Sequence, residues 1–323
     1  MSSERSRRAA LRARLLPVLA ATALLGGCGL GAGSTPGGVR LVVTRDFGAQ
    51  TLRSLRTPAV HGQETVMSLL RRNAAVTTRY GGGFVESIDG HGGGYEGSEP
   101  VDWFYYVNGV EASKGAAERD LHAGDRVWWD LHDWAQTDYI PAVVGSYPEP
   151  FRHGIEGLRL PVRVECAEPE SGPCRTVSAR LREAGVPAAR STLQPGGGGT
   201  EILRLLVGTW RQIHREPGAQ SLERGPAASG VYAKLRAAGA AIALLDAQGR
   251  EVRTLGAGAG LIAATRYAEQ SPEWLVTGTD PSGVERAAHA LDEASLRDRF
   301  AVAIAAGPTQ RTGTVLPLPQ SGS

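Results

Sequence analysis

Hydrophobic and polar positions alternate along residues 126–134, as in a β-strand whose successive side chains point to opposite faces. One face of this predicted strand carries aromatic and ionisable side chains: Trp128, Asp130, His132 and Trp134. The opposite face is more apolar and carries Val127, Trp129, Leu131 and Asp133. We expect Trp129 and Leu131 to fill a core, and two interpretations remain open for the face with Trp128 and Trp134.

A second aromatic strand is predicted at 103–107 (WFYYV). Alternation places Trp103, Tyr105 and Val107 on one face and Phe104 and Tyr106 on the other. Asn108-Gly109 follows, a pair typical of a type I′ hairpin turn that needs positive φ at both residues. We therefore expect a hairpin at this point, with at least half of the aromatic cluster in a core.

The remaining patterns of the first half predict strands at 40–44 and 84–88, a glycine-rich loop at 91–97 and a turn at 121–125. Residues 64–72 predict a short helix, because Val66, Leu69 and Leu70 have the spacing of a buried stripe. This order of elements is typical of an α+β domain with one helix on a mixed sheet.

In the second half, strands and helices alternate, which favours a small α/β layered domain. Predicted strands lie at 160–166, 202–207, 240–245 and 274–278, and predicted helices at 174–184 and 282–291. The run 202–207 is expected to be covered on both faces. Asp280 or Ser282 is the expected N-cap of the last helix.

Aromatic content falls sharply after residue 153, and we interpret the change as a domain boundary. The expected division is a β-rich domain at 39–153, an α/β domain at 154–308 and a disordered tail at 309–323. Pro148-Glu149-Pro150 and the region of Gly154 are the expected linker.

The N-terminus has the pattern of a secretory signal peptide, with an arginine-rich start and a short apolar run at 15–25. Leu25-Gly26-Gly27-Cys28 resembles the lipobox of bacterial lipoproteins, which implies cleavage after residue 27 and lipidation of Cys28. Residues 28–38 would form a flexible tether. Ser6-Arg7-Arg8 also resembles a twin-arginine signal, so the export route stays open.

Export predicts an oxidising compartment, in which Cys166 and Cys174 are expected to form a disulfide. The formal net charge of +2 is small and the arginines are dispersed, so no nucleic-acid partner is expected.

Four motifs in order resemble the transcobalamin-like C-terminal domain family: 65–70 (TVMSLL), 83–90 (GFVESIDG), 103–110 (WFYYVNGV) and, after Leu121, 124–127 (GDRV). The resemblance implies a small, β-rich, β-grasp-like module with one helix. It also implies a non-catalytic module that contacts a ligand or partner, with cobalamin as one candidate ligand. The whole arrangement is similar to that of actinobacterial lipoproteins of unknown function.

The candidate ligand-binding residues are Trp128, Asp130, His132 and Trp134, with Tyr106 from the neighbouring strand. An aromatic shelf with two polar groups could hold a ring-bearing or polyol ligand. The alternative is a solvated sheet surface without a ligand. The spacing of Asp130, His132 and Asp133 does not predict a metal site, and no catalytic motif or cofactor-binding motif is present.

These patterns predict a membrane-anchored, extracytoplasmic lipoprotein without enzymatic activity or cofactor. It would bind a small molecule or a surface partner, for example in delivering a nutrient or vitamin to a transporter. The alternative is an envelope scaffold that binds other proteins and has no small-molecule ligand.

Overall fold

The computed structural model describes residues 38–320 except 58, 61, 197 and 310. The predicted signal peptide, Cys28 and the tether up to residue 37 lie outside the described residues. Within the described part of the chain, no helix has the length and apolar character needed to cross a membrane.

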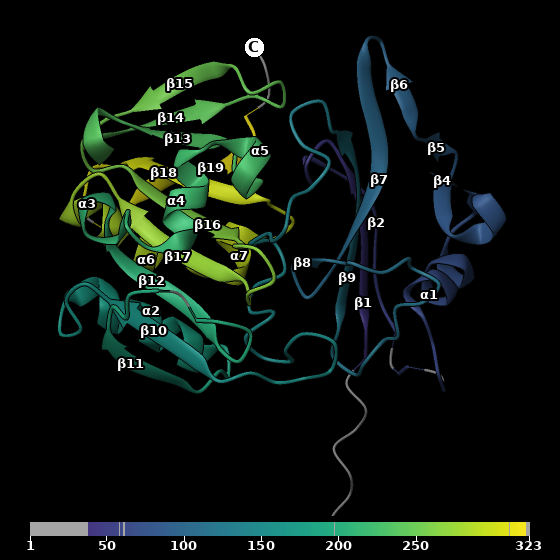
Figure 1. The fold of residues 1–323 in the computed structure, drawn as a ribbon, viewed down its shortest axis with the longest axis horizontal. Helices are drawn as coiled ribbons and strands as arrows, with labels where there is room; N and C mark the ends of the chain where they lie inside the picture. The colour runs from purple at the N-terminus through teal and green to yellow at the C-terminus, as the bar shows by residue number, and fades with distance from the viewer. Residues whose placement is uncertain (1–37, 58, 61, 197, 310, 321–323) are drawn as a thin grey trace, which may run out of the picture. The chain divides into compact units, whose positions relative to one another are not determined.

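The first sheet is mixed, as predicted, because β1 pairs in parallel with β9 while the other pairs are antiparallel (Figure 1). Its strand order is β2-β1-β9-β7-β6, with β8 beside β7. The strands are β1 (Arg40–Arg45), β2 (Gln50–Arg56), β6 (Gly94–Glu96), β7 (Glu99–Val107), β8 (Val110–Glu111) and β9 (Arg126–Asp133).

The second sheet has four parallel strands, β11-β10-β12-β17, followed by antiparallel β16, β18 and β19. Its strands are β10 (Val162–Cys166), β11 (Ala188–Thr192), β12 (Leu203–Thr209), β16 (Gly260–Thr265), β17 (Glu273–Gly278), β18 (Ala301–Ala306) and β19 (Gly313–Leu318). All but the last residue of β12 are buried, which confirms the strand expected to be covered on both faces.

The remaining strands form two small antiparallel sheets. One contains β3 (Val76–Arg79), β4 (Phe84–Ile88) and β5 (His91–Gly92), and the other contains β13 (Ala233–Arg236), β14 (Ala241–Leu245) and β15 (Glu251–Leu255). The helices are α1 (Val66–Asn73), α2 (Gly172–Glu183), α3 (Trp210–Ile213), α4 (Pro217–Glu223), α5 (Pro226–Ser229), α6 (Pro281–His289) and α7 (Glu293–Leu296). These elements confirm the coarse α+β class.

Local sequence explains where two of the three predicted helices and the hairpin form. The Thr65 hydroxyl accepts from the Ser68 N–H and caps α1, while Asp280 caps α6 by accepting from the Gly283 N–H at 2.9 Å. Asn108 and Gly109 have φ of 55° and 75°, as the predicted I′ turn requires.

Both faces of the first sheet are covered (Figure 1). Leu41, Val127 and Trp129 pack with α1 and β4 on one side. On the other side, Tyr106 and Trp128 pack against Phe300 and other residues of the second half of the chain. The first sheet is therefore the middle layer of the described residues.

Three sequence expectations are wrong in detail. The supposed linker is buried throughout residues 141–151, because Tyr147 and Phe151 pack into the core beneath the second sheet. The supposed disordered tail contains β19, which pairs with β18. The supposed loop at 91–97 contains the short strands β5 and β6.

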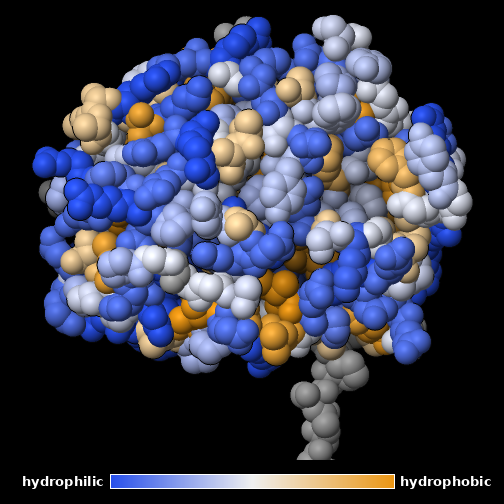
Figure 2. Space-filling view, viewed as in Figure 1, coloured by the Kyte–Doolittle hydropathy of each residue, from blue (hydrophilic) through white to orange (hydrophobic). Residues whose placement is uncertain are grey.

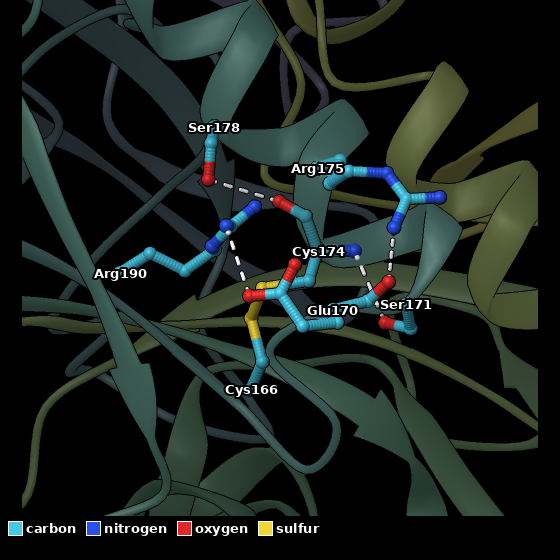
Figure 3. Close-up of a disulfide and its surroundings, with 7 residues drawn as sticks. All are labelled: Cys166, Glu170, Ser171, Cys174, Arg175, Ser178 and Arg190. Atoms are coloured by element: carbon cyan, nitrogen blue, oxygen red, sulfur yellow. Dashed lines mark hydrogen bonds and ion pairs between the residues drawn. A yellow bond between two sulfur atoms is a disulfide. The ribbon is translucent and has the colours of Figure 1, made fainter.

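The expected disulfide is confirmed: Cys166 at the end of β10 is joined to Cys174 in the first turn of α2, with a Cα–Cα distance of 6.0 Å (Figure 3). Ser171 caps this helix by accepting from the Cys174 N–H at 3.4 Å. Nearby, Arg190 on β11 is paired with Glu170 at 3.1 Å. The bridge therefore fixes the strand-to-helix connection.

Candidate functional site

The face of β9 that the sequence singled out is buried beneath the second half of the chain. Trp128, Asp130, His132 and Tyr106 lie together there, each at most 2% exposed. The predicted alternation is confirmed, but neither an open shelf nor a solvated sheet surface exists at these residues. A ligand cannot reach them without separating the two packed layers.

Asp130 is the polar centre of this buried face. Its carboxylate accepts the Phe47 and Gly48 backbone N–H groups at 3.0 and 2.9 Å. It also accepts from the Thr44 hydroxyl and contacts His132 Nδ1 at 2.8 Å. Since Thr44 in turn accepts from Trp128 Nε1 at 2.7 Å, the network ties the β1–β2 turn to β9.

Aromatic rings close over the network. The His132 ring lies between Phe104 and Phe47, with centroid distances of 4.5 and 4.6 Å. Phe300, next to β18, packs edge-on against Trp128 and His132 at 5.0 and 5.3 Å. The arrangement is that of an interface between two layers, in which tilted and edge-on ring pairs add to area burial.

Trp134 is separate from this cluster and 36% exposed at the end of β9. Tyr106 is fully buried, its hydroxyl has no hydrogen-bond partner in the described chain, and burial raises its pKa. The five candidate residues therefore do not form one accessible binding site.

An open cavity of about 470 Å³ lies instead where the two sheets meet. It is lined by the ends of β7 and β8, the 155–160 connection and the loops at 200 and 266–272. Figure 2 shows hydrophobic side chains on this face near the junction of the two sheets. The lining mixes apolar residues with polar and charged ones, and a small-molecule site uses the first for contact area and the second to orient the ligand.

Arg119 lines this cavity and is 6% exposed. Its Nη1 donates to the Asp120 carbonyl at 3.1 Å. The guanidinium makes no ion pair with a carboxylate of the described residues. A buried cation without a counter-ion is costly, and such groups concentrate at binding and catalytic sites.

Glu111, on β8, also lines the cavity, and its Oε2 is buried without a hydrogen-bond partner in the described chain. Burial raises the pKa of this carboxyl to about 8, the Ile140 N–H opposes the rise, and Asp138 adds to it. At neutral pH Glu111 therefore holds its proton in most molecules and can donate a hydrogen bond.

The other charged groups of the cavity have partners. Glu156 lies 3.8 Å from Lys114, and Arg266 lies 3.5 Å from Glu269 while donating to the Gln270 carbonyl at 2.6 Å. Arg119 and Glu111 are thus the ionisable groups of the lining that have no ion-pair partner among the described residues.

A larger cavity of about 750 Å³ beside the β1–β2 turn is a weaker candidate. Its lining mixes several carboxylates with Arg297 and Arg299, and it includes Gln320, the last described residue. Within the described residues, no group of three or more His, Cys, Asp or Glu side chains could hold a metal ion.

Sequence reasoning missed the cavity because its residues come from segments far apart in the chain. Glu111 and Arg119 follow the hairpin turn without any motif, and the opposite wall comes from loops of the second half. No local pattern in the sequence marks them.

Residues 63–133, which include α1, β7 and β9, match a family described as a domain of unknown function (DUF4430). No curated protein matches the chain. Among solved structures, the chain is similar to a Ruminococcus gnavus protein described as a candidate metal-binding protein, at 15% identity. That match has a TM-score of 0.25 and covers 30% of this chain and 97% of the other.

Replacing Asp130 tests its structural role. Asp130→Ala leaves the Phe47 and Gly48 N–H groups without their acceptor, so we expect the free energy of unfolding to fall by about 3–5 kcal/mol. Urea denaturation monitored by circular dichroism measures the change. Exposed Glu118→Ala is the control and should shift stability by less than about 0.5 kcal/mol. Equal stability of the two variants would contradict the role.

Replacing Glu111 tests its raised pKa. The folded state binds this proton more tightly than the unfolded state, whose pKa is near 4.5, so the free energy of unfolding falls as pH rises from about 4.5 through about 8. We expect the free energy of unfolding of Glu111→Gln to equal that of the wild type near pH 4 and to exceed it by a growing margin up to pH 9. The full difference corresponds to about 1.4 kcal/mol for each unit by which the folded-state pKa is raised. Denaturation midpoints across this range, with Glu118→Gln as control, measure the difference. A constant difference at all pH values would show that the pKa is not raised.

Proposed function

We propose that this chain is a lipid-anchored extracytoplasmic protein that binds a small molecule in the cavity at the junction of its two sheets. The observation that carries the proposal is the cavity itself, whose lining mixes apolar and polar residues and includes two ionisable groups without an ion-pair partner among the described residues. Small-molecule sites combine these features, with polar groups that fix the orientation of the ligand.

The proposed anchor rests on residues 1–28 of the sequence, where an arginine-rich start and an apolar run precede Cys28. The disulfide is consistent with an oxidising compartment outside the cytoplasm. The transcobalamin-like resemblance of the first half supports a module that contacts a ligand or partner. Delivery of a nutrient to a transporter would join these features in one function.

The proposed chemistry is binding without conversion. The ionisable residues that the sequence singled out, Asp130 and His132, form hydrogen bonds inside a closed aromatic interface. In this position they stabilise the packing of the layers rather than act on a substrate.

An envelope scaffold is the second candidate function. Tyr80 is 87% exposed and packs against Phe84, also partly exposed, at a ring distance of 6.3 Å on the small sheet beyond α1. An exposed aromatic pair of this kind favours contact with another protein.

Cavity binding can be tested by a thermal-shift screen of the full chain with corrinoids, amino acids, short peptides, sugars and fatty acids. A ligand that binds the folded state raises the melting temperature. We expect Ser113→Trp, which places a large ring in the lining, to weaken a hit at least tenfold by calorimetry. Ser98→Trp, on an exposed turn away from the cavity, is the matched control. Equal affinity of both variants, or no hit at all, would contradict the proposal.

Anchoring can be tested by replacing the cysteine of the lipobox. Cys28→Ser removes the thiol that would carry the lipid, so we expect the protein to move from the membrane fraction to the soluble fraction of an expressing bacterium. Immunoblotting of the two fractions measures the shift, and Ser34→Ala should remain membrane-bound. Membrane retention of Cys28→Ser would argue against a lipid anchor at this residue.

A further inference from the structure

The junction cavity contains one basic and one acidic side chain that have no ion-pair partner among the described residues. Arg119 is a permanent cation, and Glu111 is a carboxyl that becomes an anion when a cation approaches it. Both line the same cavity, yet no ion pair joins them. A buried ionisable group without a partner lowers the stability of the folded protein. A partner from outside the chain is therefore the simplest explanation for two such groups at one cavity.

The causes of the raised pKa of Glu111 indicate that no cationic side chain lies near this carboxyl among the described residues. These causes are burial, the Ile140 N–H and Asp138, and no arginine or lysine contributes. Arg266, whose guanidinium also lines the cavity, is held by Glu269 and the Gln270 carbonyl. Arg119 and Glu111 therefore do not neutralise each other through an ion pair.

Apolar side chains also line the cavity. Val110 comes from β8, while Ile155 and Leu160 come from the connection between the sheets. Leu158 on the same connection is 62% exposed at the cavity. A volume of about 470 Å³ suits a small organic molecule rather than a folded partner.

We infer that this cavity holds a small zwitterion with an apolar body, an α-amino acid or a short peptide, with its carboxylate on Arg119 and its ammonium on Glu111. The inference rests on the proposed small-molecule function and names its ligand class. Arginine is suited to the carboxylate because its planar guanidinium can donate two parallel hydrogen bonds. The ammonium would restore the ionised form of Glu111 by supplying the opposite charge that the chain does not provide.

Calorimetric titration of the wild-type full chain with a matched ligand series tests the class without any mutation. The series is leucine, Leu-Leu and Leu-Leu-Leu, with N-acetyl-Leu-Leu lacking the ammonium and Leu-Leu-amide lacking the carboxylate. We expect either blocked dipeptide to bind at least about tenfold more weakly than its free form, since a charge-assisted hydrogen bond is lost. The relative affinities of leucine and the peptides distinguish a free amino acid from a short peptide.

Two variants assign the ends of the ligand. Arg119→Met should bind the free and amidated dipeptides equally, and Glu111→Gln should bind the free and acetylated dipeptides equally. Arg253→Met, an exposed arginine on β15, is the control and should keep both preferences. Circular dichroism verifies the fold, and Arg119→Gln, which also removes the charge but keeps a polar side chain, replaces the methionine variant if that variant does not fold.

The outcomes separate this inference from the proposed function. The zwitterion is supported if Arg119→Met loses the preference for a free carboxylate and Glu111→Gln loses the preference for a free ammonium. It is overturned if the wild type binds the blocked dipeptides as tightly as the free dipeptide. If the series does not bind while another compound binds in a Ser113-dependent way, the zwitterion is wrong and the small-molecule function stands. If no compound binds, both are wrong.

Discussion

Asp130 is the constraint on which the arrangement of the layers depends. Its fully buried carboxylate receives two backbone N–H groups, the Thr44 hydroxyl and the His132 ring. Burial of an ionised carboxylate is tolerated only when such donors replace water. The hydrogen bonds to this carboxylate fix the β1–β2 turn over β9. They also place Phe47 against His132, Tyr232 and Phe300. The second half of the chain packs on this surface.

The candidate site is a consequence of that packing. Once the layers are joined at the aromatic interface, residues 141–151 are buried between their cores, and the next residues of the connection line a cavity beside β8. Arg119 and Glu111 come from the first half of the chain, while the loop at 266–272 comes from the second. The cavity therefore requires both halves of the chain, and neither half contains it completely.

The sequence predicted those features that depend on neighbours along the chain. Alternation correctly divided Trp128 from Trp129, helical spacing located α1 and α6, and Asn108-Gly109 identified the turn. The sequence could not show what covers the face with Trp128 and His132. The same aromatic pattern occurs on a sheet that binds a ligand and on a sheet that packs against a second layer of the protein. Short strands such as β5 and β6 were missed because their glycines resemble loops, and β19 because it depends on pairing with β18. Arg119 and Glu111 carry no motif, and only tertiary structure shows that neither has an ion-pair partner in the part of the chain that the structure describes.

We propose that a ligand of complementary charge pairs with Arg119 and Glu111 at the junction of the layers. A crystal structure of the chain soaked with Leu-Leu, or with leucine if that binds more tightly, is the decisive measurement. We expect ligand density in the cavity, with a carboxylate within about 3 Å of the Arg119 guanidinium and an ammonium at the same distance from Glu111. Density elsewhere, or a ligand in the cavity that leaves both side chains without a new partner, would contradict it.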